Sequence, residues 1–118
     1  MLRFVVLTHD HPTLHWDFML EHGTRLRTWR LAQPPDADSP IDAEPLGDHR
    51  LAYLDYEGPV SGGRGEVHRW DHGEFEAIES TPERIVVRLS GARLRGEVSL
   101  ERLHRSGKWK FRRNSPSI

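Results

Sequence analysis

The sequence contains no cysteine, which excludes disulfide bonds, thiolate nucleophiles and cysteine-based zinc sites. No apolar run approaches the roughly 20 residues that a membrane-spanning helix needs. The apolar run near the N-terminus is too short for a secretory signal peptide. We therefore expect a cytoplasmic protein that makes no contact with a membrane.

A sustained helical period of apolar residues is also absent. Instead, short alternating segments are separated by turns that contain glycine. These segments are residues 2–8, 14–21, 25–32, 66–71, 75–80, 83–90, 94–104 and 109–113. Eight or nine short strands predict a mainly β fold, a small closed or nearly closed β-barrel.

The length of 118 residues corresponds to one domain, which we place at residues 1–113, with a frayed tail at 114–118. At most one or two short helices are expected, near residues 36–54. The Pro- and Asp-rich segment 33–48 is expected to be a loop, and a turn is expected at residues 71–73.

Charge is unevenly distributed along the chain, although the net charge is only −1. Residues 83–113 carry ten Lys or Arg and three Glu, a net charge of +7, so residues 1–82 carry −8. This basic segment is a candidate surface for a polyanion such as nucleic acid. Alternatively, the two parts neutralise each other in the folded protein.

Four histidines, two aspartates and a glutamate lie within residues 8–23. Strand alternation places His15 and Asp17 on the same face, and Pro12 lets the chain turn so that His9 or His11 folds back beside them. Two imidazoles and one carboxylate can form a facial site for Mn, Fe or Zn with open positions for a phosphate oxygen. The alternative is a solvated strand face that carries histidines by chance.

A second group lies in the stretch "DHRLAYLDYEG", where His49 and Tyr53 are four residues apart. This spacing places them on one face in either a helix or a strand. Together they offer proton transfer and a hydrogen bond to an oxyanion. The alternative is a packed tyrosine beside a loop histidine.

In this order, the stretches resemble the 3′-phosphoesterase domain of bacterial DNA ligase D and its stand-alone relatives. The family pattern is a His, a second His six residues later and an Asp two further, which His9, His15 and Asp17 match. The similarity covers nearly the whole chain. Its other parts are "TWRLAQPP", "DHRLAYLDYEG", "SGGRGEVHRWDHGEF" and, more loosely, "LSGARLRGEVSLERLHRSGKWKFRR".

This resemblance implies a β-barrel with a divalent metal, Mn in the first place and otherwise Zn or Co, held by His9, His15 and Asp17. It implies that His49 and Tyr53 contact the phosphate, with His49 as the proton donor. The implied activity is removal of a 3′-phosphate or 3′-ribonucleotide from a DNA or RNA primer strand, which leaves a 3′-hydroxyl. The implied partners are nucleic acid 3′ ends and the ligase or polymerase of a repair system, and we expect a monomer.

The sequence departs from the family at three positions that handle the phosphate. The family Arg two residues after the Asp is Met19, a Gln before the first His is Leu7, and a Lys is Gln33. A methionine cannot replace the bidentate fork of an arginine. If Met19 lines the metal pocket, we expect Mn binding with weakened turnover, and Met19→Arg should raise the activity.

Two arginines at neighbouring positions, Arg30 and Arg64, are candidates to bind the substrate in place of the missing one. A different class of function is also open, a non-catalytic module that binds metal and nucleic acid or assists a repair ligase. A third possibility is a phosphoesterase for a small phosphorylated metabolite, which the near-neutral net charge allows.

Overall fold

The computed structural model describes residues 1–104 and 106–114. These residues form nine strands and one 3-10 helix, in the order β1 (Leu2–His9), β2 (His15–His22), β3 (Arg25–Leu31), β4 (Ile41–Arg50), η1 (Leu51–Leu54), β5 (Gly58–Pro59), β6 (Glu66–Ser80), β7 (Arg84–Gly91), β8 (Arg95–Arg102) and β9 (Trp109–Arg113). The mainly β prediction is confirmed, and η1 lies within the segment where a short helix was expected.

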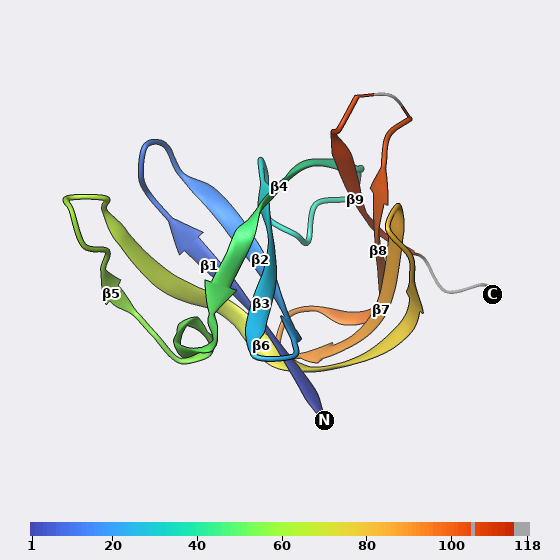
Figure 1. Ribbon diagram of the computed structural model, residues 1–118, viewed down its shortest axis with the longest axis horizontal. Helices are drawn as coiled ribbons and strands as arrows, with labels where there is room; N and C mark the ends of the chain where they lie inside the picture. Colours follow the sequence, from blue (N-terminus) through green and yellow to red (C-terminus); the bar gives the residue numbers. More distant parts are fainter. Residues whose placement is uncertain (105, 115–118) are drawn as a thin grey trace.

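Eight strands close into an antiparallel barrel in the order β1-β2-β3-β4-β9-β8-β7-β6, with β6 returning to pair with β1. The two-residue strand β5 pairs with the first two residues of β6 and is the ninth strand of the sheet. Figure 1 shows β1 to β4 on one side and β7 to β9 on the other, with the long strand β6 joining the two sides. The predicted closed barrel is therefore confirmed.

Two predicted irregular segments are strands instead. The expected turn at residues 71–73 lies inside the 15-residue strand β6. Gly73 allows β6 and β7 to approach closely there, because a Cβ atom on it would lie 2.2 Å from the backbone oxygen of Ser90. The expected loop at 33–48 ends earlier, since β4 begins at Ile41 and alternates buried Ile41 and Ala43 with exposed acidic residues.

The strands bury apolar side chains on both faces of the sheet, and β1 is the clearest case. Phe4 and Val6 point into the barrel, where they join the main core. Val5 and Leu7 point outward and join a smaller group that we call the outer cluster. The buried members of the outer cluster are Val5, Leu7, Met19, Leu26, Leu54 and Val67.

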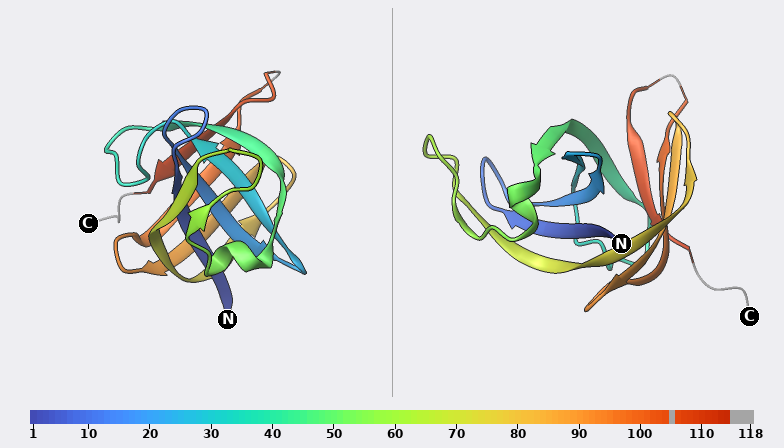
Figure 2. Two further views of the ribbon diagram at one scale, coloured as in Figure 1. Left: turned by 90° about the vertical axis from the view of Figure 1, so that its left-hand side faces the viewer. Right: turned by 60° about the horizontal axis from the view of Figure 1, so that its bottom comes forward.

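Helix η1 covers this outer cluster, since Leu54 is one of its buried members and Leu51 and Tyr53 pack against it. The left view of Figure 2 shows η1 and β5 in front of the β1 to β3 strands. Helix η1 therefore shields part of one surface of β1, β2 and β6 from solvent. The candidate site lies on this partly covered face.

Asn114 is the only residue of the predicted tail that belongs to the described part of the chain. The backbone N–H of Asn114 donates a hydrogen bond of 2.9 Å to the carbonyl of Glu97. Residues 115–118 of the predicted frayed tail lie outside the described residues.

The Asp71 side chain stabilises the turn between β7 and β8 through hydrogen bonds. Its buried carboxylate accepts hydrogen bonds from the backbone N–H groups of Ala92, Arg93 and Leu94, at 2.9, 3.2 and 2.8 Å. Gly91 makes room for this contact, because a Cβ atom there would lie 2.4 Å from a carboxylate oxygen of Asp71. A single side chain thus satisfies three backbone donors of the turn that joins β7 and β8.

Candidate metal centre

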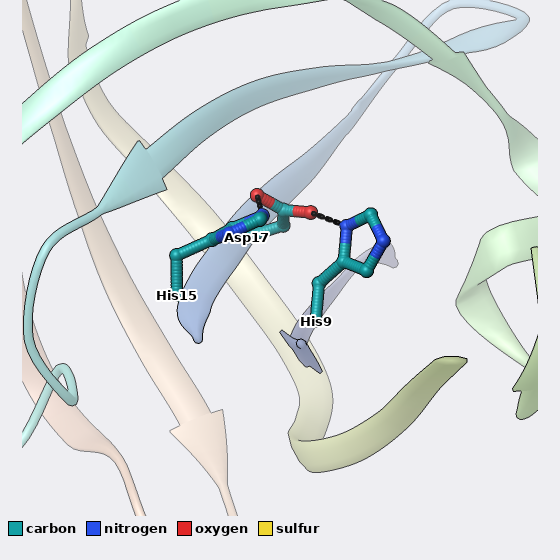
Figure 3. Close-up of side chains that lie close together, drawn as sticks. All are labelled: His9, His15 and Asp17. Carbon is teal, nitrogen blue, oxygen red and sulfur yellow. Dashed lines mark ion pairs between the residues drawn. The ribbon is translucent and has the colours of Figure 1, made fainter. Parts of the chain in front are cut away.

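The β1–β2 hairpin brings the three predicted ligands together. His9 lies directly opposite His15 in the antiparallel pairing, so both imidazoles leave the sheet on one face. Asp17 follows on that face two residues along β2. One ligand atom of each residue lies within 4.8 Å of the other two. Figure 3 shows the carboxylate of Asp17 between the two rings.

Two backbone carbonyls orient the imidazoles. Nε2 of His9 lies 2.7 Å from the carbonyl oxygen of Arg64, and Nδ1 of His15 lies 2.9 Å from that of Thr13. A carbonyl can only accept a hydrogen bond, so these nitrogens carry the protons of the neutral rings. The unprotonated nitrogens, Nδ1 of His9 and Nε2 of His15, are 3.7 and 3.2 Å from the Asp17 carboxylate.

The centre is buried and incompletely satisfied. His15 is 4% exposed and Asp17 is 3% exposed, while His9 is half-buried. Nε2 of His15 and Oδ1 of Asp17 lie 3.2 Å apart, and neither atom has a well-aligned hydrogen-bond partner among the described residues. Buried polar atoms without partners are costly, so an arrangement of this kind needs an explanation.

Burial and charge act in opposite directions on His15. Burial lowers the pKa of its imidazole, but the adjacent Asp17 carboxylate outweighs burial and raises that pKa above the ordinary value of 6.5. A divalent cation would replace the proton between these groups and satisfy both free atoms. Two imidazole nitrogens and a carboxylate oxygen suit Mn, Fe, Co or Zn. The side chains therefore fit a metal ion.

His11 does not share this arrangement. It is exposed, and its ring centroid is 6.5 Å from that of His9. The structure groups His9, and not His11, with His15 and Asp17. Strand register explains the choice, because His9 is still paired within the sheet whereas His11 belongs to the loop that follows.

The turn before β6 supports His9 from a distant part of the sequence. The backbone N–H of Glu66 donates to the Asp10 carboxylate at 2.8 Å, which ties this turn to the β1–β2 loop. Gly65 adopts a φ of +74° there, and a Cβ atom on it would lie 2.1 Å from Asp10 Oδ1 and 2.8 Å from His11 Cβ. The carbonyl of Arg64 therefore reaches His9 because residue 65 has no side chain. Sequence analysis did not identify this support, since a backbone carbonyl leaves no residue-type signal.

We predict that Gly65→Ala weakens metal binding at His9. The added methyl group must displace the turn and with it the Arg64 carbonyl, and loss of such an outer partner typically lowers metal affinity about 10- to 100-fold. Gly63→Ala is the matched control, because Gly63 also has a positive φ but nothing lies within 4 Å of its Cβ position. Mn²⁺ titration of both variants measures the effect, and equal affinities would contradict it.

His49 and Tyr53 form a second pair, at the end of β4 and in η1. Their ring centroids are 5.7 Å apart with the edge of one ring toward the face of the other. Nδ1 of His49 donates to the Gly47 carbonyl at 2.8 Å when it carries the proton, which leaves Nε2 free. The predicted shared face of these residues is thus present. No hydrogen bond or ion pair between described residues joins this pair to the His9–His15–Asp17 group.

Comparison with known proteins gives the same family as the motif order. The family model for the DNA ligase D 3′-phosphoesterase domain matches residues 7–102, which include both the metal group and the His49–Tyr53 pair. The chain belongs to the DNA ligase D 3′-phosphoesterase domain family.

Two full-length relatives of this phosphoesterase-family chain illustrate the similarity. The multifunctional non-homologous end joining protein LigD of Pseudomonas aeruginosa is 32% identical over 118 residues, which cover 92% of this chain. The protein of the same name from Mycobacterium bovis is 30% identical over 108 residues, or 84% of this chain. The chain spans only 14% of the length of each, so it matches one part of a much larger protein.

The residues at the positions where the family handles the phosphate, Met19, Leu7 and Gln33, differ in their burial. Met19 is on the same face as Asp17, as predicted, but the prediction that it lines the metal pocket is wrong. Met19 is 1% exposed and belongs to the outer cluster, which also contains Leu7 and Leu54. Apolar packing within this cluster explains the difference. Gln33 is exposed in the connection between β3 and β4.

The two candidate substrate-binding arginines also differ. Arg30 lies opposite Asp17 in the β2–β3 pairing, so its side chain leaves the sheet on the metal face. Arg64 is exposed, and its guanidinium donates to the backbone and side-chain oxygens of Ser61 at 2.7 and 3.2 Å. Only its carbonyl contacts the metal group.

Charges of the basic segment are partly neutralised by acidic residues from earlier in the chain. Four such pairs are formed: Arg84 with Glu79, Arg88 with Glu76, Lys110 with Asp42, and Arg113 with Asp38. These contacts favour mutual neutralisation as the role of these four cations. In the described part of the chain, no helix has the length and apolar character to span a membrane.

Proposed function

We propose that this chain is a metal-dependent phosphoesterase that acts on the 3′ ends of nucleic acid strands during DNA end repair. The observation that carries the proposal is the convergence of two imidazole nitrogens on a buried carboxylate, with the other nitrogen of each ring facing a backbone carbonyl. Outer hydrogen bonds of this type are typical of histidine metal ligands. Membership of the 3′-phosphoesterase family supplies the substrate class.

In this proposal His9, His15 and Asp17 hold the metal, with Mn²⁺ as the first choice and Zn²⁺ or Co²⁺ as alternatives. The bound ion would act as a Lewis acid on a phosphoryl oxygen and stabilise the charge that develops there. The donor set is compact, so three protein ligands leave positions open for substrate and water.

His49 and Tyr53 handle the phosphate and the leaving group in this proposal. The Gly47 carbonyl fixes the His49 ring, so its free Nε2, when protonated, can deliver a proton to the departing 3′ oxygen. The edge-to-face contact with Tyr53 limits rotation of both rings. The Tyr53 hydroxyl makes no hydrogen bond to another described residue and is therefore available to donate to a phosphoryl oxygen. The product is a strand with a free 3′-hydroxyl.

Incubation with Mn²⁺ and a primer-template that ends in a 3′-phosphate or a 3′-ribonucleotide tests this function. We expect conversion to a 3′-hydroxyl end, loss of conversion on chelation of the metal, and unchanged conversion by His11→Ala, whose side chain lies outside the metal group. Conversion by a metal-free sample would overturn metal dependence.

A second candidate function is favoured by one observation, the apolar burial of Met19 where the family carries a cation. It is a non-catalytic module that binds metal and nucleic acid ends, or a partner of a repair ligase. Saturable Mn²⁺ and primer binding without any conversion of either 3′ end would establish it and exclude the phosphoesterase.

A further inference from the structure

A hollow of about 550 Å³ opens beside His15 at one end of the barrel. It lies where β2, β4 and β9 begin and β3 ends. Its lining includes Thr13, His15, Arg30, Glu44, Lys108 and Trp109. His15 belongs both to this lining and to the metal group, so the hollow adjoins the metal group.

Arg30 is placed between the hollow and the metal group. It pairs with Asp17 on β2, so the two side chains leave the sheet as immediate neighbours on adjacent strands. Met19 occupies the next position along the same face of β2. The Arg30 side chain therefore leaves the sheet from the strand next to β2, on which the family carries its arginine at position 19.

The Arg30 guanidinium has unused hydrogen-bonding capacity. Its Nε is buried and has no partner among the described residues. Glu44 lies opposite Arg30 on β4, yet the described contacts include no ion pair of 4 Å or less between them. A buried guanidinium nitrogen without a partner is costly unless a ligand completes it.

The other cations near this face are placed differently from Arg30, and Lys108, which also lines the hollow, is exposed. The Arg64 guanidinium is bound to Ser61. The Nε of Arg69 is also buried without a partner among the described residues, but Arg69 lies opposite Leu7, which separates it from Asp17, and it lines a different hollow with Leu54 and Asp55. An arginine at position 19 would place its charge within the outer cluster, which is unfavourable without a partner.

We propose that Arg30 binds the substrate phosphate beside the metal, from the hollow next to His15, and so replaces the arginine that the family carries at position 19. This inference rests on the proposed function and identifies the residue that would supply its missing positive charge. A guanidinium can contact two phosphoryl oxygens at once, which an ammonium group cannot do with the same geometry. Arg30 is not among the metal ligands, so its role is separable from metal binding.

The test compares wild type, Arg30→Ala and Arg30→Lys in the full chain loaded with Mn²⁺. We expect Mn²⁺ affinity within about twofold of wild type in both variants. Inorganic phosphate binding should weaken about tenfold or more in Arg30→Ala, and kcat/KM for an oligonucleotide 3′-phosphate should fall about 100- to 1,000-fold. Arg30→Lys should recover only part of either loss.

Arg25→Ala is the matched control, since it removes an exposed guanidinium at the opposite end of the same strand, β3. It should bind phosphate like wild type. Unchanged phosphate binding in Arg30→Ala with Mn²⁺ bound would overturn the proposal, as would an equal loss in Arg25→Ala. Wild-type protein that binds phosphate through Arg30 without turning over the oligonucleotide would uphold this inference and overturn the phosphoesterase function.

Discussion

Asp17→Asn is expected to abolish Mn²⁺ binding while leaving the metal-free protein at least as stable as wild type. The amide loses the negative charge that the cation requires, and loss of a direct ligand should cost more than the roughly 10- to 100-fold typical of an outer partner. The same change replaces a buried charge, whose Oδ1 has no hydrogen-bond partner among the described residues, with a neutral group. An amide N–H can also donate to Nε2 of His15, which is 3.2 Å from that oxygen.

The pH of this comparison decides whether the stability effect is visible. The pKa of His15 is raised in the folded protein, so its attraction to Asp17 stabilises the fold fully below pH 6.5 and is lost as the pH rises through the raised pKa. Well above that pKa the pair contributes nothing, and the metal-free variant should unfold at or above the wild-type temperature. The comparison should therefore be made there.

Thermal unfolding with and without Mn²⁺ provides the measurement. At a metal concentration of 100 times Kd, wild type should gain about 2.7 kcal/mol, or roughly 10 °C in Tm, and Asp17→Asn should gain nothing. His11→Ala should respond like wild type. A purely structural Asp17 predicts the opposite pattern, with a clear loss of stability in the metal-free variant and no metal response in either protein.

The largest loss of stability is expected for Asp71→Ala. This change leaves three backbone N–H groups of the β7–β8 turn without their acceptor, and Leu94 is itself buried in the main core. A buried donor without a partner, here that of Leu94, costs about 1–3 kcal/mol, and the two part-buried bonds add less, so we expect about 2–4 kcal/mol in total. That is a large share of the 5–15 kcal/mol by which typical domains are stable.

Denaturant unfolding of three proteins checks this value. Asp71→Asn retains one acceptor oxygen and should lose less stability than Asp71→Ala. Glu76→Ala is the control on the same strand, because its exposed pair with Arg88 at 3.7 Å should contribute less than about 1 kcal/mol. A loss for Asp71→Ala no greater than that of the control would show that solvent satisfies the turn.

Strand alternation predicted the metal group because its residues are close in sequence and lie on one hairpin. His15 and Asp17 follow from a period of two, and the β1–β2 pairing adds His9 from the opposite strand. The same alternation failed at Met19, which has the predicted direction but not the predicted surroundings. Met19 lies in the outer cluster, which includes Leu54 of η1, and no local pattern shows that a helical turn 35 residues later joins the same cluster.

The fold prediction failed where glycine and proline have more than one structural use. Gly73 resembles a turn residue in sequence, but it lets β6 and β7 approach closely within a continuous strand. The role of Asp71 was missed for a different reason. Its partners are backbone N–H groups more than 20 residues away, which no local pattern indicates. The closed sheet and six of its strands, β1, β2, β3, β7, β8 and β9, were predictable because each of these carries its own alternation, whereas β4 and β5 were not among the predicted segments and β6 joins two of them.

The candidate ligands and their support assemble at different stages of folding. All three ligands lie within residues 9–17, so they meet when β1 first pairs with β2, a local event that is fast. The carbonyl that orients His9 belongs to residue 64, which is 55 residues away, and arrives only when β6 closes the barrel. The β1–β2 hairpin alone therefore brings together the three groups that would hold the proposed metal, and barrel closure adds the carbonyl that orients His9.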